Sequence, residues 1–194
     1  MANPQGITLS GAIIALGANL PHEGQPPDHA VRLAVAALKA QGIEVRLSRL
    51  WRTPCFPAGA GPDYVNAAAV VIPPAGMGPD DLLALLHRIE GDHGRKRLSR
   101  WAGRTLDLDL IAWGDSVLPD AGTQAAWRDL SLERQAQEAP ERLILPHPRV
   151  QDRAFVLVPL ADVAPDWVHP VLGKSVGEMI AALPPAEVEA VKPL

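Results

Sequence analysis

One short segment constrains this chain more than any other: residues 105–111, TLDLDLI, alternate between polar and apolar side chains. Such alternation is typical of a β-strand, in which residues two apart point to the same face, about 7 Å apart along it. Asp107 and Asp109 therefore share one face, and Leu108 and Leu110 share the other. The segment predicts a strand that packs one face on an apolar core and presents two neighbouring carboxylates on the other.

Basic side chains gather just before this strand. Six of the 18 Lys and Arg residues lie within residues 88–104, around Trp101, although the chain carries a formal net charge of −4. Two adjacent carboxylates repel each other and need cations, and Mg²⁺ typically takes one or two carboxylates together with substrate phosphates. Neighbouring guanidinium groups neutralise the charge that develops during phosphoryl transfer. The combination favours a nucleotide site.

Each half of this pattern has a simpler interpretation when it is taken alone. An Asp-x-Asp pair is more often a solvated strand edge than a metal site, and a basic loop is usually solubilising surface. The acidic net charge argues against wholesale binding to nucleic acid, so the local basic cluster favours a specific anionic ligand. The acids and the arginines together therefore favour a nucleotide site over a solvated surface.

Composition and cysteine usage narrow the class of protein. Apolar residues make up 47% of the 194 residues and charged residues 21%, as in an ordinary soluble protein. The single cysteine, Cys55, excludes an internal disulfide and a cysteine-based zinc site, and its position predicts a small buried side chain. No apolar run reaches the length of a membrane span. We expect a cytoplasmic enzyme without a membrane partner, built as a single domain over residues 1–194.

The remaining pattern predicts an α+β fold. Apolar runs and alternation predict three further strands, at residues 12–16, 43–51 and 65–72. Helices are expected at 28–40, with Asp28 as N-cap and Gly42 just past the end, and from Pro79 onwards. This order is βαββαβ, the ferredoxin-like arrangement, with an antiparallel sheet, both helices on one face and the other face left for ligands.

The C-terminal half is less regular. Short helices are expected near residues 130–136 and 175–183, in a C-terminal extension of the sheet domain. Residues 115–141 are polar and have the character of an insertion, with no chemistry that the sequence identifies. Residues 184–194, which hold three prolines, are expected to form a loose tail.

Four blocks of sequence carry a resemblance to a known family. They are ALGANL at residues 15–20, RTP and DYVNAA from Arg52, RIE and RWAGRTLDLDL from Arg88, and LPHPR with DRAFVLVPL from Leu145. In these blocks the chain resembles the 6-hydroxymethyl-7,8-dihydropterin pyrophosphokinase (HPPK) family of folate biosynthesis, over roughly residues 12–170 apart from 115–141. The third block is the most specific. The resemblance implies a ferredoxin-like fold and transfer of the pyrophosphoryl group of ATP to the pterin hydroxymethyl group, which releases AMP.

The resemblance also implies roles for individual residues in catalysis. Asp107 and Asp109 match the ligands of two Mg²⁺ ions that bridge the ATP phosphates and contact the pterin hydroxyl. Arg95 and Arg104 match arginines that clamp the phosphates when a loop closes. Such a lid excludes water, which competes as an acceptor of the transferred group.

Substrate contacts follow from the same blocks. For the pterin, Tyr64 and Phe155 match an aromatic pair that sandwiches the ring, Asn66 matches the contact to its amide edge, and Thr53 and Pro54 match backbone contacts. The family's ATP-binding positions correspond to Glu90, Arg97, Trp101, Arg104, Leu110, Arg142, His147 and Arg153. ATP and a reduced pterin are therefore the expected small-molecule partners, and the chain is expected to act as a monomer.

Plainer interpretations remain open for several of these residues. Phe155 lies in an apolar run and could be part of the core, Asn66 could cap a loop, and His147 could be a turn histidine between two prolines. Two other functions also remain open. A catalytically silent binding module would bind ATP and Mg²⁺ without turnover, and a metal-dependent nucleotidyl transferase or nuclease would use the same two acids.

Overall fold

The computed structural model describes residues 11–55, 59, 61–92 and 104–194. The elements of the sheet domain are β1 (Ala12–Ala18), α1 (Pro27–Ala40), β2 (Glu44–Leu47), β3 (Trp51–Thr53), β4 (Tyr64–Ile72), α2 (Pro79–Asp92) and β5 (Asp107–Trp113). They are followed by α3 (Ala121–Arg128), α4 (Leu132–Gln137), η1 (Val150–Asp152), α5 (Ala154–Val163), α6 (Val176–Ala182), α7 (Pro185–Glu189) and β6 (Lys192–Pro193). No helix within the described ranges is long and apolar enough to cross a membrane.

The fold is a mixed α/β fold built on one antiparallel sheet. The strands run in the order β5-β1-β4-β3-β6, and β2 also pairs with β4. The apolar runs predicted as strands 12–16 and 65–72 are the two central strands, β1 and β4, which pair along their full length. The Asp-x-Asp segment is β5, which pairs with β1 on one side.

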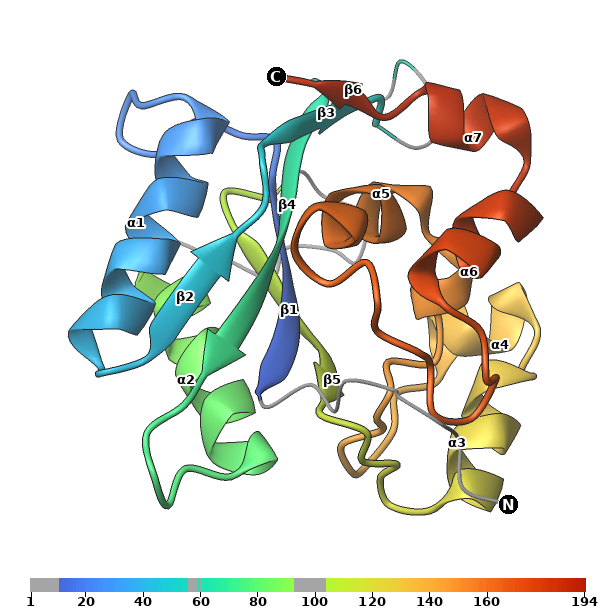
Figure 1. The fold of residues 1–194 in the computed structure, drawn as a ribbon. Helices are drawn as coiled ribbons and strands as arrows, with labels where there is room; N and C mark the ends of the chain where they lie inside the picture. The colour runs from blue at the N-terminus through green and yellow to red at the C-terminus, as the bar shows by residue number, and fades with distance from the viewer. Residues whose placement is uncertain (1–10, 56–58, 60, 93–103) are drawn as a thin grey trace.

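Helices α1 and α2 cover one face of the sheet (Figure 1). Apolar side chains of α1, including Val31 and Leu38, pack with Leu108 and Leu110 of β5 in the main core. The predicted ends of these helices are largely confirmed, because Gly42 follows the last turn of α1 with φ 76° and α2 begins at Pro79. The prediction of Asp28 as N-cap is wrong, since Pro27 occupies the first helical position and Pro26 precedes it.

The second face of the sheet is not open, contrary to the expectation that helices cover only one face. Helices α5 and α6 pack on it (Figure 1), and Val156, Leu157 and Leu160 of α5 join Ile13 and Ile111 in a second core. The run 154–163 is apolar on nearly every side because the sheet, α6 and the loops enclose it. Helix α5 therefore covers part of the face that was expected to be left for ligands.

The predicted strand at 43–51 is two strands instead of one. Leu47 of β2 lies opposite Ala69, whereas Trp51 of β3 lies opposite Asn66, so three residues of the strand face two of β4. The hydroxyl of Ser48 accepts a hydrogen bond from the Ala68 N–H (3.0 Å), which accommodates the extra residue. A bulge of this kind turns the following side chains to the other face. The alternation of residues 43–47 therefore cannot continue to Trp51.

The predicted loose tail is also ordered. Residues 185–189 form α7, Lys192 and Pro193 pair with β3, and the Leu194 N–H donates to the Leu50 carbonyl oxygen (2.9 Å). Val191 is buried against Trp51, so tertiary packing holds a segment whose composition predicts disorder.

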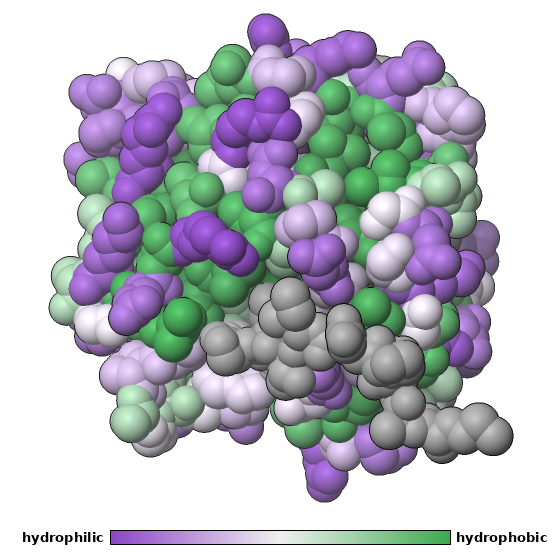
Figure 2. All heavy atoms as spheres, viewed as in Figure 1, coloured by the Kyte–Doolittle hydropathy of each residue, from purple (hydrophilic) through white to green (hydrophobic). Residues whose placement is uncertain are grey.

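On the face of the molecule shown in Figure 2, apolar patches are separated by polar side chains.

Candidate active site

Asp107 and Asp109 lie on the same face of β5, as the alternation predicts. Leu108 and Leu110 point the other way, into the main core. Both acids are paired with arginine: the Arg104 guanidinium forms an ion pair with Asp107, and Arg153 Nη1 lies 3.3 Å from Asp109 Oδ2. Burial lowers the pKa of Arg104, but the Asp107 carboxylate outweighs that effect and raises it above its ordinary value. The strand therefore presents two carboxylates in a setting that already accommodates positive charge.

Glu90 fixes the strand between the two acids. The residue is only 2% exposed, and its Oε1 accepts a hydrogen bond from the Leu108 N–H (2.8 Å). A buried carboxylate that accepts a backbone hydrogen bond holds its partner firmly. Glu90 is thus placed to position Asp107 and Asp109 from beneath the strand.

A row of directly opposite residues crosses the sheet at Asp107. In register, Trp51 lies opposite Asn66, Asn66 opposite Gly17, and Gly17 opposite Asp107. Directly opposed residues share a face of the sheet, so Asn66 and Asp107 lie on either side of Gly17. Gly17 has no side chain to fill the space between them. A Cβ at Gly17 would lie 3.0 Å from Asn66 Oδ1, which is tighter than an ordinary contact. We refer to the row of Asn66, Gly17 and Asp107 as the slot.

Three of the predicted pterin residues, Thr53, Tyr64 and Asn66, lie in or beside this row. Asn66 is buried, and its Nδ2 donates to Thr53 Oγ1 (2.7 Å), so it lies inside a strand and does not cap a loop. Tyr64 is half-buried at the start of β4; burial raises its pKa, and it is close enough to Arg104 and Asp107 for their charges to act on it. Pro54 is exposed at the end of β3.

Phe155 is 41% exposed and does not belong to the core, although it begins an apolar run. The Arg153 guanidinium lies over its ring, 5.7 Å from the centroid. Because Arg153 also pairs with Asp109, it links an aromatic ring to the second acid. The Cys55 thiol is buried and donates to the Gly61 carbonyl oxygen (2.9 Å), as expected for a small side chain that holds a loop.

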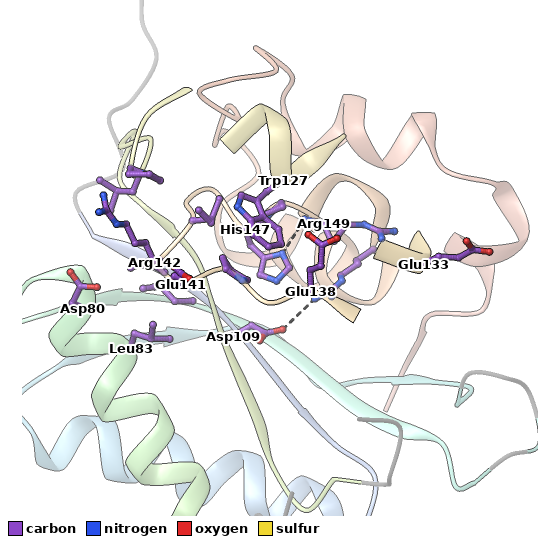
Figure 3. A pocket seen from close by; sticks show the side chains of 18 residues that line it. Asp80, Leu83, Asp109, Trp127, Glu133, Glu138, Glu141, Arg142, His147 and Arg149 are labelled. Carbon is purple, nitrogen blue, oxygen red and sulfur yellow. Dashed lines mark hydrogen bonds and ion pairs between the residues drawn. The ribbon is translucent and has the colours of Figure 1, made fainter. Parts of the chain in front are cut away.

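A cleft of about 1110 Å³ opens beside Asp109. The predicted residues Asp109, Leu110, Arg142, His147 and Arg153 line it. Figure 3 shows Asp80 and Leu83 of α2 on one side of the cleft and Trp127 and His147 on the other. The volume slightly exceeds the usual range of about 300–1,000 Å³ for small-molecule sites and is sufficient for a nucleotide.

His147 enters the cleft as a neutral side chain. Its backbone N–H donates to the Ile111 carbonyl oxygen (2.8 Å), and its Nδ1 accepts from the Arg149 N–H (3.1 Å). Burial, reinforced by the charges of Arg153 and Arg149, lowers its pKa from 6.5 to about 3. With Nδ1 accepting, the ring proton is on Nε2, which is then a hydrogen-bond donor for a ligand. His147 is therefore a turn histidine, with its hydrogen bonds made within the loop and to β5, and its side chain also lines the cleft.

Two predicted ATP-binding residues lie elsewhere, and three further predicted residues are not among those described. Arg95, Arg97 and Trp101 fall outside the described residues, as does most of the cationic loop. Glu90 and Arg104, both predicted to contact ATP, do not line the cleft; Glu90 lies under β5 and Arg104 lies beside Asp107.

Sequence reasoning missed Asn19, which ties this region together. Its side-chain Oδ1 accepts from the Arg104 N–H (2.8 Å), its Nδ2 donates to the Pro62 carbonyl oxygen (3.2 Å), and its own N–H donates to the Arg104 carbonyl oxygen (3.0 Å). The available signal was its place directly after a buried strand, where a polar residue often reaches a site. Asn19 thereby sets the position of the Arg104 backbone.

The described residues contain no group of three or more His, Cys, Asp or Glu side chains that could hold a metal ion. A pair of carboxylates is nevertheless a suitable donor set for Mg²⁺, which keeps several waters and uses substrate phosphates as further ligands. In this structure the guanidinium groups of Arg104 and Arg153 supply the positive charge that balances Asp107 and Asp109. The residues present therefore fit Mg²⁺ that arrives with a phosphorylated ligand.

The sheet, the paired acids and the adjoining slot and cleft define an α/β domain of the phosphoryl-transfer class. Comparison with known proteins identifies the family. The family model for 7,8-dihydro-6-hydroxymethylpterin-pyrophosphokinase (HPPK) matches residues 13–165, and the chain belongs to this family.

Curated relatives agree with this assignment. The chain is 40% identical over 172 residues to a 2-amino-4-hydroxy-6-hydroxymethyldihydropteridine pyrophosphokinase of Synechocystis, an alignment that covers 88% of this chain and 74% of the relative. The Haemophilus influenzae protein of the same name is 35% identical over 161 residues, covering 82% of this chain and 84% of the relative. That of Methylorubrum extorquens is 34% identical over 188 residues, covering 95% and 100%.

Solved structures support the fold. A crystal structure of Plasmodium falciparum HPPK-DHPS wild type with STZ-DHP matches with a TM-score of 0.60 at 12% sequence identity, over 88% of this chain and 42% of that chain. A crystal structure of HPPK-DHPS in complex with substrates matches with a TM-score of 0.59 at 10% identity, over 88% and 44%. The chain thus spans less than half of these longer proteins, and at such identity the likeness concerns the fold alone.

Proposed function

We propose that this protein transfers the pyrophosphoryl group of ATP to the hydroxymethyl group of 6-hydroxymethyl-7,8-dihydropterin, in folate biosynthesis. The products are the pterin diphosphate and AMP. Family membership and the names of the curated relatives support this activity. In the reaction the substrate hydroxyl oxygen bonds to the β-phosphorus, the bond from that phosphorus to the oxygen bridging to the α-phosphate breaks, and the hydroxyl proton is lost.

The observation that carries the proposal is the position of the two acids between two binding regions. Asp107 belongs to the slot with Gly17 and Asn66, whereas Asp109 lines the cleft. A transferase must hold its donor and acceptor in contact, and the near-attack geometry accounts for a large part of the rate enhancement. A strand whose alternate residues reach both regions supplies that contact.

Asp107 and Asp109 would hold the Mg²⁺ of the reaction, two ions by analogy with the family. Magnesium neutralises phosphate charge and lowers the pKa of a hydroxyl that it contacts. The arginines that now pair with the acids, Arg104 and Arg153, would then be available to the phosphates. Arg95 is proposed to join Arg104 in stabilising the charge of the transition state, and Arg97 and Trp101 to contact ATP.

The slot is proposed to take the pterin. Asn66 offers both a donor and an acceptor to the amide edge of the ring, and its hydrogen bond to Thr53 fixes its orientation. Tyr64 and the exposed ring of Phe155 are proposed to stack on the two faces of the pterin, with Pro54 and the Thr53 backbone at its rim. In the cleft, the backbone of Leu110, whose side chain packs in the main core, would contact the base, while Arg142 and the Nε2–H of His147 would bind polar groups of ATP.

Finer features of the protein are proposed on the same basis. The order of β1, α1, β2, β4, α2 and β5, with β1 and β4 central, supports a ferredoxin-like topology followed by a C-terminal extension. Residues 1–194 are proposed to act as a single catalytic domain, as a monomer in the cytoplasm, with ATP and the reduced pterin as partners.

The test is incubation with ATP, Mg²⁺ and 6-hydroxymethyl-7,8-dihydropterin, followed by chromatography of the nucleotides. The proposal predicts AMP in an amount equal to the pterin consumed. ADP in place of AMP would contradict pyrophosphoryl transfer. Binding of ATP with no nucleotide product would instead support the silent binding module.

A further inference from the structure

Residues 115–141, for which the sequence indicates no chemistry, form a wall of the cleft. Seven of the residues that line the cleft come from this segment, among them Leu118, Pro119 and Trp127. Figure 3 shows Trp127 and Glu138 on the side of the cleft that lies across from Asp80 and Leu83 of α2. The segment therefore encloses a ligand that the sheet alone would leave open to solvent.

The wall is tied to the site and is not a free insertion. Leu118 and Leu145 exchange two backbone hydrogen bonds (2.8 and 3.1 Å), and Asp120 caps α3 by accepting from the Thr123 N–H (2.9 Å). Gln124 is fully buried, and its Nε2 donates to the carbonyl oxygen of Pro146 (3.2 Å), the residue before His147. Helix α3 is thus anchored to the same loop that brings His147 into the cleft.

Trp127 is the one Phe, Tyr or Trp side chain among the cleft residues of the described ranges. It lies one turn after Gln124 on α3 and is half-buried, so part of its ring faces the cleft. Leu83, Leu118, Leu143 and other apolar residues line the same space. A flat ring beside aliphatic side chains is suited to an aromatic base.

Charge indicates which end of a nucleotide lies near this wall. Glu133, Glu138 and Glu141 line the cleft from the 115–141 segment, with Glu138 in an ion pair with Arg134, and exposed carboxylates disfavour a triphosphate. Arg153 lies at Asp109, the acid assigned to magnesium and phosphate. The Asp109–Arg153 pair therefore marks the phosphate end of the cleft, and the apolar lining formed by Leu118, Pro119 and Trp127 marks the end for the uncharged nucleoside.

We propose that Trp127 stacks on the base of the bound nucleoside triphosphate, so that residues 115–141 recognise the nucleoside end of the donor. This inference rests on the proposed function, because it takes ATP as the ligand of the cleft. Stacking of a base on an aromatic side chain is insensitive to the identity of the base. The wall therefore contributes affinity for nucleotides over inorganic polyphosphates, and only weak preference among bases.

The experiment compares two ligands by isothermal titration calorimetry in the presence of Mg²⁺: ATP, and inorganic tripolyphosphate, which has no base. Trp127→Ala should bind ATP about tenfold more weakly than the unmodified protein. Its affinity for tripolyphosphate should not change, and Trp127→Phe should recover most of the lost ATP affinity. An equal loss for both ligands, or no loss for ATP, would overturn the inference.

Fluorescence tests the same contact without the alanine variant. ATP should quench a component of tryptophan emission that is missing in Trp127→Phe, while tripolyphosphate should not quench it. The matched control is Trp113→Phe, at the end of β5 and packed on the main core, which should keep the ATP-dependent quench. An unchanged quench in Trp127→Phe would contradict stacking.

The two proposals fail in distinguishable ways. If the unmodified protein forms AMP and Trp127→Ala binds ATP normally, only the role of Trp127 is wrong. If the unmodified protein neither binds ATP nor forms AMP, the proposed function itself is wrong.

Discussion

The slot beside Asp107 and the wall beside Asp109 are built in different ways. Residues of the slot lie in register on three paired strands, where Asn66, Gly17 and Asp107 form one row. The wall is a pair of short helices held by a few tertiary hydrogen bonds, such as that from Gln124 to Pro146. Strand periodicity fixes which side chains share a face, whereas a tethered insertion is placed by contacts that no local pattern encodes. The comparison predicts that the two regions respond separately to mutation.

The largest effect is expected where the two regions meet. Asp107→Ala or Asp109→Ala should lower turnover by about three orders of magnitude or more, because each removes a proposed ligand of the ion that would hold both substrates in contact. Steady-state kinetics gives the loss, and circular dichroism checks that the fold is intact. Asp166→Ala, at an exposed acid between α5 and α6, is the control. Near-normal turnover in either site variant would refute the metal assignment.

A mutation in the slot should affect one substrate only. Asn66→Ala removes a buried amide that bonds Thr53 and the proposed pterin edge, and should raise the KM for the pterin roughly tenfold to a hundredfold. The KM for ATP should stay within about twofold, because the wall and cleft are unaffected. Thr53→Ser, which keeps the hydroxyl, should behave nearly as the unmodified protein. An equal rise in both KM values would show that slot and cleft are not independent.

A mutation in the wall should affect only the other substrate, and Gln124, which anchors the wall, is the residue to change. Gln124→Leu leaves the Pro146 carbonyl oxygen without its donor and should lower the free energy of unfolding by roughly 1–2 kcal/mol. It should also raise the KM for ATP while the KM for the pterin is unchanged. Urea denaturation and steady-state kinetics measure the two effects, with Gln137→Leu at an exposed position of α4 as control. A changed pterin KM would argue that the wall also shapes the slot.

The smallest expected effect is a pH dependence of the free energy of unfolding, which we assign to His169 near the wall. His169 is 0% exposed, and its Nδ1 accepts from the Val171 and Leu172 N–H groups (3.2 Å each). Burial, with the charge of Arg128 on α3, lowers its pKa from 6.5 to about 4. Between these values the unfolded chain binds a proton and the folded chain does not, so stability is full above pH about 6.5 and falls as the pH falls towards 4.

From pH 7 to 5.5 the loss of unfolding free energy attributable to His169 should be roughly 1 kcal/mol. His169→Asn, whose amide oxygen can accept the same backbone hydrogen bonds, should flatten the pH dependence, as measured by urea denaturation at each pH. His29→Asn, at an exposed position of α1, should leave it unchanged. A slope that persists in His169→Asn would assign the effect to other groups.

The parts of the molecule that follow local periodicity could be predicted from sequence. The central strands, the shared face of Asp107 and Asp109, and the ends of α1 and α2 marked by Gly42 and Pro79 all have local signals. The cover of the second sheet face by α5, the bulge after Leu47 and the pairing of β6 could not be predicted, because distant segments determine them.

The residues of the candidate site likewise fall into those that could be predicted from local sequence and those that could not. Asn66, Phe155 and His147 were identified through sequence blocks that resemble the family; in the structure Asn66 belongs to the slot, His147 lines the cleft, and Phe155 is exposed with Arg153 over its ring. Asn19, Gln124 and Trp127 were missed, because their roles depend on which backbone or cavity they meet in the folded chain.

The most direct test of the account is a count of bound divalent ions, with Mn²⁺ as a paramagnetic substitute for Mg²⁺ and a non-hydrolysable ATP analogue present. Electron paramagnetic resonance should detect two Mn²⁺ per chain in the unmodified protein when the pterin is also added, and fewer in Asp109→Ala. The same number of ions in Asp109→Ala and in the unmodified protein would contradict the claim that this pair of strand carboxylates recruits the metal for transfer.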